Sequence, residues 1–67
     1  MVTDGAQVLD WSRLIRAEYE EWPDLRLTQA QVEEWWGLDA AVTTAALDAL
    51  VSAGVLRRTH EGVYLRA

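Results

Sequence analysis

The tight turn Gly37-Leu38-Asp39 is the feature that most constrains how this chain can fold. Glycine adopts the left-handed backbone that ends a helix, and an aspartate two residues later is placed to cap the next one. Leu38 between them can fill the angle that the two helices make. The turn therefore predicts a helix over 28–36, a sharp change of direction and a second helix over 40–53.

Both helices carry further signals at their ends. Thr28-Gln29-Ala30-Gln31 matches a capping box, with Thr28 as the N-cap and Gln31 at the third helical position. Gly54 is placed to cap the end of the second helix. At about 100° per residue, one face of that helix gathers four side chains that we expect in the core: Thr43, Leu47, Leu50 and Val51.

Another helix is predicted nearer the start of the chain, over residues 7–22. Its large apolar residues recur in steps of three and four and make one stripe: Val8, Trp11, Leu14, Ile15, Tyr19 and Trp22. Pro23 ends this helix because the residue before a proline is pushed out of helical geometry. We expect Trp11 and Trp22 to pack in the core against the 40–53 helix.

The last part of the sequence has the pattern of a β-hairpin. Val55–Thr59 and Val63–Arg66 are predicted strands, and His60-Glu61-Gly62 between them is a short loop that contains glycine. The predicted fold class is therefore mainly α with a small β-hairpin, in a single domain over residues 1–67.

Composition excludes several kinds of site. The chain has 67 residues, no cysteine and one histidine, which excludes disulfides, thiolate metal sites and multi-histidine metal sites. It has no lysine, no glycine-rich phosphate loop and no nucleophile beside a base, and its paired acids lie on amphipathic helices. We therefore expect a binding module with no metal and no cofactor, not an enzyme.

The sequence also bears on where the protein works. No apolar run approaches the about 20 residues that span a bilayer. The first five residues, Met1-Val2-Thr3-Asp4-Gly5, lack the basic and apolar regions of a signal peptide. We expect a cytoplasmic protein with no membrane contact.

The net charge of −5 is unevenly spread along the chain. Residues 1–36 hold eight acids against three arginines, whereas residues 55–67 hold three arginines against Glu61 alone. Because every DNA phosphate is negative, nucleic acid is expected to approach only from the hairpin.

Three stretches of the sequence together resemble a winged helix-turn-helix motif. They are Leu27-Thr28, Trp36-Gly37-Leu38-Asp39 and Ala46-Leu47-Asp48-Ala49-Leu50-Val51-Ser52-Ala53-Gly54-Val55-Leu56-Arg57-Arg58. It is similar to the N-terminal domains of GntR-type bacterial transcription regulators, and the hairpin fits the wing. The resemblance covers about residues 25–66 and implies a very short strand within 23–27 that pairs with the wing. Those regulators carry a second, ligand-sensing domain that has no counterpart here, so the chain also looks like small stand-alone bacterial winged-helix proteins.

The resemblance implies that the 40–53 helix enters the major groove of DNA. The implied contact positions are Asp39, Ala40, Ala41, Val42 and Thr44. Thr44 is the one polar, uncharged residue among them, and the helix carries no basic residue. This helix therefore offers little to neutralise phosphates or to read bases.

The hairpin is better suited to DNA. Arg57, Arg58 and Arg66 flank it, and His60 lies at its tip. An arginine of a wing can enter the minor groove. Arg57 and Arg58 are neighbours on a strand and should point to opposite faces, so only one of them is expected on any single surface.

Two functions follow from these features. The first is a small DNA-binding, transcription-regulator-like protein that acts as a dimer on double-stranded DNA, with contacts from Arg57, Arg58, Arg66, His60 and Thr44. The alternative is a protein–protein interaction module with no direct DNA binding. Its contact would be an apolar patch of Trp35, Ala41 and Val42 that binds a protein partner or a second copy of the chain. Trp35 is expected to face outward and the adjacent Trp36 to lie in the core.

Overall fold

Three helices and a small antiparallel sheet make up the fold. The computed structural model describes the backbone of residues 4–67 and the side chains of residues 8–67. In chain order the elements are α1 (Asp4–Glu21), β1 (Leu27–Thr28), α2 (Gln29–Trp36), α3 (Ala40–Ser52), β2 (Leu56–Arg58) and β3 (Val63–Arg66). The prediction of a mainly helical chain with a β-hairpin is confirmed, and the largest difference in bounds is the earlier start of α1.

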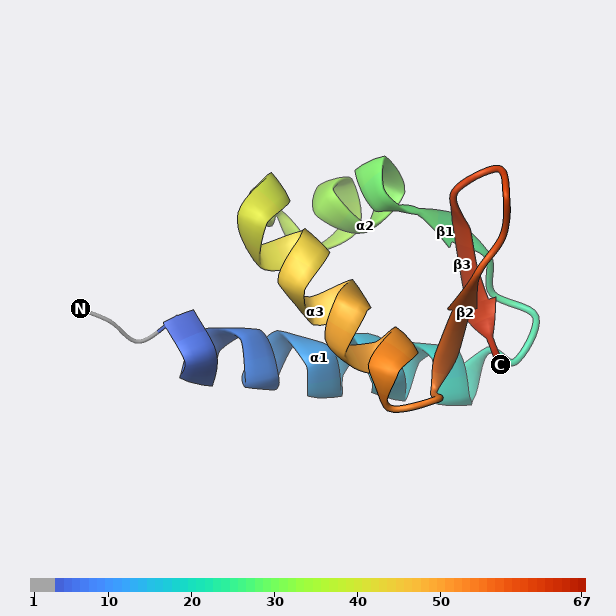
Figure 1. The fold of residues 1–67 in the computed structure, drawn as a ribbon, viewed down its shortest axis with the longest axis horizontal. Helices are drawn as coiled ribbons and strands as arrows, with labels where there is room; N and C mark the ends of the chain where they lie inside the picture. Colours follow the sequence, from blue (N-terminus) through green and yellow to red (C-terminus); the bar gives the residue numbers. More distant parts are fainter. Residues whose placement is uncertain (1–3) are drawn as a thin grey trace.

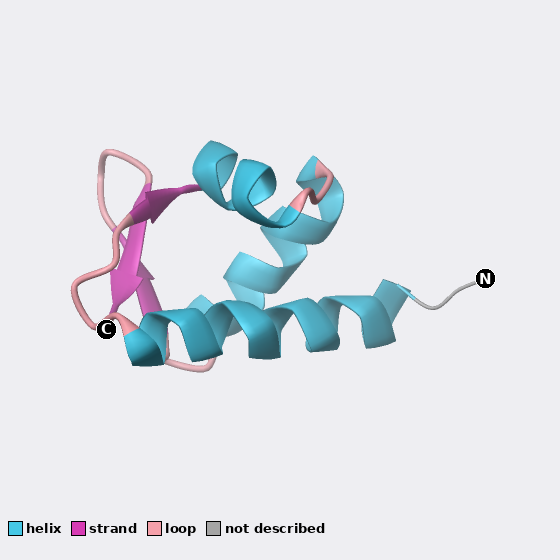
Figure 2. Cartoon of the chain, turned by 180° about the vertical axis from the view of Figure 1, so that it is seen from behind, coloured by secondary structure: helices cyan, strands magenta, loops and turns pink. Residues whose placement is uncertain are grey.

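The helices form the body of the molecule and the sheet closes one end of it. α1 lies along one side, α3 runs obliquely across it, and α2 lies on the far side of α3 from α1 (Figure 1). The hairpin turn projects from the sheet at the end away from α1, and the connector from α1 enters the sheet from the α1 side (Figure 2). The first turns of α1 extend beyond the other elements.

The predicted N-caps of α2 and α3 and the predicted end of α2 at Gly37 are confirmed. The C-cap of α3 is Ala53, and Gly54, the predicted cap, follows it with φ of 78°. The Thr28 hydroxyl accepts a hydrogen bond from the Gln31 backbone N–H, and the Gln31 side chain accepts one from the Thr28 N–H at 2.9 Å. Gly37 ends α2 in the left-handed conformation, with φ of 64°. Asp39 then caps α3, since its Oδ1 accepts the Val42 N–H at 2.8 Å. Local signals therefore fix the sharp angle between α2 and α3.

The sheet has the strand order β1-β3-β2, and both pairings are antiparallel. Tyr64 in the central strand pairs with Leu27 on one side and with Arg58 on the other. The short strand that the resemblance implied before α2 is thus present at Leu27–Thr28, and it pairs with the hairpin. β1 and β2 are the two edges of the sheet.

The core lies between the three helices and the inner face of the sheet. Its members are Ile15, Tyr19, Leu27, Val32, Ala46, Leu47, Leu50, Leu56 and Tyr64. Tyr19 is fully buried, and its hydroxyl donates to the Tyr64 carbonyl oxygen at 2.7 Å. Burial disfavours the tyrosinate and raises the pKa of Tyr19 to about 12. One hydrogen bond therefore joins the last part of α1 to the central strand.

The prediction that Trp22 lies in the core is wrong. Its side chain is 59% exposed, whereas Trp11 is half-buried against the core as expected. α1 ends at Glu21, and the Leu25 N–H donates to the Trp22 carbonyl oxygen at 2.9 Å, which closes a turn. The turn brings Leu25 back against the core, and the Trp22 indole stays outside.

Two other residues expected on buried faces are exposed. Leu14 is 52% exposed and Val51 is 37% exposed. Each adjoins a buried residue, Ile15 or Leu50, and a step of one residue turns a side chain by about 100° on a helix. The buried faces of α1 and α3 are therefore narrower than the apolar stripes in the sequence.

Candidate nucleic-acid interface

Thr59 builds the turn that joins β2 to β3. Its N–H donates to the Val63 carbonyl oxygen at 2.9 Å, and its carbonyl oxygen accepts the Gly62 N–H at 3.0 Å. Its hydroxyl accepts the N–H groups of Glu61 and Val63, at 3.3 and 3.1 Å. Gly62 has φ of 82°, a conformation in which a side chain would be strained. The role of Thr59 was not predicted, although serine and threonine hydroxyls commonly bond nearby backbone groups in turns.

Arg57, Arg58, Thr59 and His60 line one hollow beside this turn. Both arginines are exposed, and no acidic residue lines the hollow with them. The prediction that only one of the two arginines joins any single surface is therefore wrong. β2 is an edge strand of three residues, so long side chains from both of its faces can reach around the free edge.

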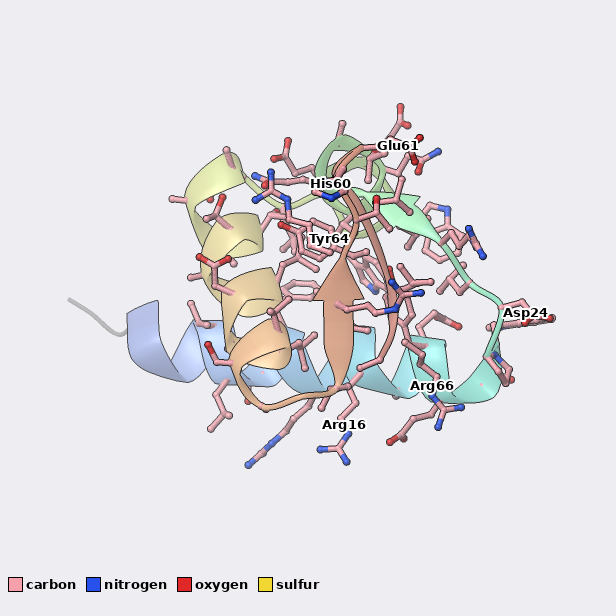
Figure 3. All side chains as sticks on the ribbon, turned by 45° about the vertical axis from the view of Figure 1, so that its right-hand side comes forward. Arg16, Asp24, His60, Glu61, Tyr64 and Arg66 are labelled. Atoms are coloured by element: carbon pink, nitrogen blue, oxygen red, sulfur yellow. The ribbon has the colours of Figure 1, made fainter. Side chains whose placement is uncertain are left out.

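The arginines of this hollow are available to an anionic partner. Within residues 8–67, the one ion pair joins Arg16 to Glu20 at 3.0 Å. Neither Arg57 nor Arg58 is held by a carboxylate in that part of the chain. Glu61 lies at the tip of the turn beside His60 and is the nearest acid along the chain (Figure 3).

Arg66 does not line the hollow at the turn. It lies at the other end of the hairpin, close to α1, whereas His60 lies at the turn (Figure 3). There it lines a separate hollow with Arg16 and Glu20. The structure therefore divides the four hairpin candidates into a group at the turn and Arg66 apart from it.

The start of α3 is exposed but its polar groups are already engaged. Ala40 and Ala41 are exposed and Val42 is half-buried. Asp39 is used in capping the helix, and the Thr44 hydroxyl accepts a hydrogen bond from Gln29 Nε2 at 2.8 Å. Thr44 thus ties α3 to α2, and this end of α3 offers no positive charge.

Trp35 faces outward, as predicted, with 55% of its side chain exposed. Trp36 packs against the core and meets the Trp35 ring edge to face, with 5.3 Å between the centroids. The hollow that Trp35 lines is shared with Trp22, Pro23, Asp24 and Leu25. Ala41 and Val42, the companions expected from the sequence, do not line it.

The part of the chain that the structure describes has neither a membrane-spanning helix nor a cluster of metal ligands. No helix there is long and apolar enough to cross a bilayer. Across the same residues, no three histidine, cysteine or acidic side chains gather where they could hold a metal ion. Two hollows among residues 8–67 are lined by a pair of arginines and no acid, one at the turn and one between α1 and α3 with Arg13 and Arg16. Because Arg16 is paired with Glu20, the hollow at the turn is the stronger candidate for an anionic partner.

Comparisons of the chain with models of known families, with curated proteins and with solved structures find no match.

Proposed function

We propose that this chain is a winged-helix protein that binds double-stranded DNA through the β2–β3 hairpin. The observation that carries the proposal is the hollow lined by Arg57, Arg58, Thr59 and His60. In a chain with a net charge of −5, two exposed arginines in a hollow that no acid lines give that hollow the opposite sign, although Glu61 lies beside it at the tip of the turn. Such a surface attracts a polyanion.

The order of elements supports the same proposal. A helix, a two-residue strand, two helices joined by the Gly37 turn and a hairpin follow one another as in the resemblance. The short strand β1 pairs with the hairpin and so holds it against the helices. In this arrangement the hairpin turn is free to reach a groove of DNA beside α3.

We expect the protein to bind DNA with little preference for base sequence. Thr44 and the alanines at the start of α3 supply no bidentate contact to a base. Phosphate neutralisation by Arg57 and Arg58 supplies the affinity, so binding falls steeply with salt. A dimer would place two hairpins on one duplex and offset the small number of contacts.

The test is a salt series of fluorescence anisotropy with an end-labelled, mixed-sequence DNA duplex. The parent protein is expected to bind at low salt. The variant Arg57→Gln with Arg58→Gln is expected to bind more weakly, with a slope of log affinity against log salt shallower by about 2. The matched control is Arg13→Gln with Arg16→Gln, which removes the same amount of positive charge from α1. Arg16 lies far from the hairpin turn (Figure 3).

Two outcomes overturn the proposal. One is the absence of binding by the parent at low salt, which would favour the protein–protein module that does not contact DNA. The other is an equal loss of binding in the α1 control, because the affinity would then follow net charge and not the hairpin surface.

A further inference from the structure

Two exposed tryptophans from separate parts of the chain line one hollow that the proposed DNA contact does not use. Trp22 follows the end of α1, and Trp35 lies in the last turn of α2. Their side chains are 59% and 55% exposed, and Pro23 and Leu25 complete the apolar lining. Exposed indoles are costly in water and are common in protein-binding hot spots.

One acidic residue lines this hollow, and further acids adjoin its lining residues in the sequence. Asp24 lines it and points outward from the connector (Figure 3). Glu21 adjoins Trp22, Glu34 adjoins Trp35, and both are exposed. Residues 18–36 together hold six acids against Arg26 alone. These acids give the surface a negative field that repels nucleic acid and attracts cations.

The size of the hollow limits what can enter it. The open hollow has a volume of about 420 Å³, which leaves room for a few side chains of a peptide segment. The connector that lines it leads into β1, whereas Arg57 and Arg58 lie on β2 at the opposite edge of the sheet. An occupant here would leave the hairpin turn free.

We propose that the Trp22–Trp35 hollow binds a basic peptide segment of a partner protein, with arginine side chains over the indoles and apolar side chains between them. An arginine guanidinium is attracted to the face of a tryptophan ring and stacks on it. Asp24 and the negative field of the nearby acids attract the flanking positive charges, and Pro23 and Leu25 contact the apolar side chains. This occupant matches both properties of the surface, its exposed aromatic rings and its negative charge.

The test is calorimetric titration of the 67-residue chain with three blocked peptides. The first, acetyl-Arg-Leu-Arg-Leu-Arg-amide, carries both properties of the proposed partner. The second replaces each leucine by glycine and keeps the charge, and the third replaces each arginine by glutamate. The first peptide is expected to bind, the second to bind more weakly and the third not to bind.

Variants assign the binding to the hollow. Trp22→Ala with Trp35→Ala is expected to weaken binding of the first peptide about tenfold, from the loss of two cation–π contacts. Asp24→Asn with Glu34→Gln changes only exposed side chains and is expected to weaken binding and flatten its salt dependence. The matched control is Leu9→Ala with Leu14→Ala, which removes two other exposed apolar side chains and should leave binding unchanged.

Three results would overturn the proposal. The first peptide fails to bind the parent, the charge variant binds it as tightly as the parent, or the glutamate peptide binds as well. A parent dimer in sedimentation that dissociates on the Trp22→Ala change, with no peptide bound, assigns the hollow to a second copy of the chain. DNA binding should stay unchanged in the tryptophan variant, which separates this surface from the hairpin.

Discussion

Replacing Tyr19 by phenylalanine should change how the stability of the protein depends on alkaline pH. The Tyr19 hydroxyl is fully buried and donates to the Tyr64 carbonyl oxygen, and its pKa is raised from 10.0 to about 12. In the unfolded chain this hydroxyl loses its proton near pH 10, whereas the folded protein holds the proton to about pH 12. Between these values the unfolded state binds fewer protons, so rising pH favours unfolding.

The size of this loss of stability follows from the shift in the pKa of Tyr19. Each pKa unit corresponds to about 1.4 kcal/mol, so the Tyr19 contribution, complete below pH 10, falls by roughly 2 to 3 kcal/mol by pH 12. Tyr19→Phe removes this dependence and costs about 1 kcal/mol at neutral pH, through the lost hydrogen bond. The stability curves of the two proteins should therefore cross between pH 10 and 12.

The assay is urea unfolding followed by tryptophan fluorescence at steps from pH 7 to 12. The chain has no lysine, and every ionisable group other than Tyr19 is common to both proteins. Subtracting the two curves isolates Tyr19. If the free energies of unfolding of parent and variant stay parallel from pH 9 to 12, the account of Tyr19 as a buried, neutral donor is refuted.

Further substitutions test the packing and the turn. Leu47→Ala removes a fully buried side chain of α3 and should lower the free energy of unfolding by about 2 to 5 kcal/mol in urea titration. Val51→Ala, on the exposed side of the same helix, should lower it by under about 1 kcal/mol, and equal losses would contradict the assigned faces of α3. Gly37→Ala should cost about 1 to 2 kcal/mol in the same titration because φ is positive there, with no steric part since nothing lies within 4 Å of the added Cβ; an unchanged stability would show that the turn does not need this conformation.

The parts of the fold that local chemistry determines could be predicted from the sequence. Thr28, Gln31, Gly37 and Asp39 act on backbone groups within a few residues, so their types and spacing were sufficient. That one of Trp35 and Trp36 faces outward could also be predicted, because two adjacent residues on a short helix cannot both face the core. Helical geometry alone does not determine which of the two it is.

Positions that depend on a neighbouring element could not be obtained in this way. Helical periodicity placed Trp22 in the core, but the turn that closes at Leu25 determines which side chain is buried there. The same turn brings Trp22 into the hollow with Trp35, a contact between segments that no local pattern encodes. The alternation of side chains along a strand likewise predicted that Arg57 and Arg58 lie on different surfaces. Both line one hollow, because β2 is an edge strand and its free edge is open to side chains from either face.

The position of β3 has a consequence for synthesis of the chain. β1 and β2 do not pair with each other, and both depend on β3, which comes last in the sequence. While the ribosome is still adding the residues before Val63, the emerging chain can form helices but no sheet, and Tyr19 lacks its acceptor on Tyr64. We expect this nascent intermediate to be sensitive to proteases until Val63–Arg66 leaves the exit tunnel, when the sheet forms and the core closes in one step.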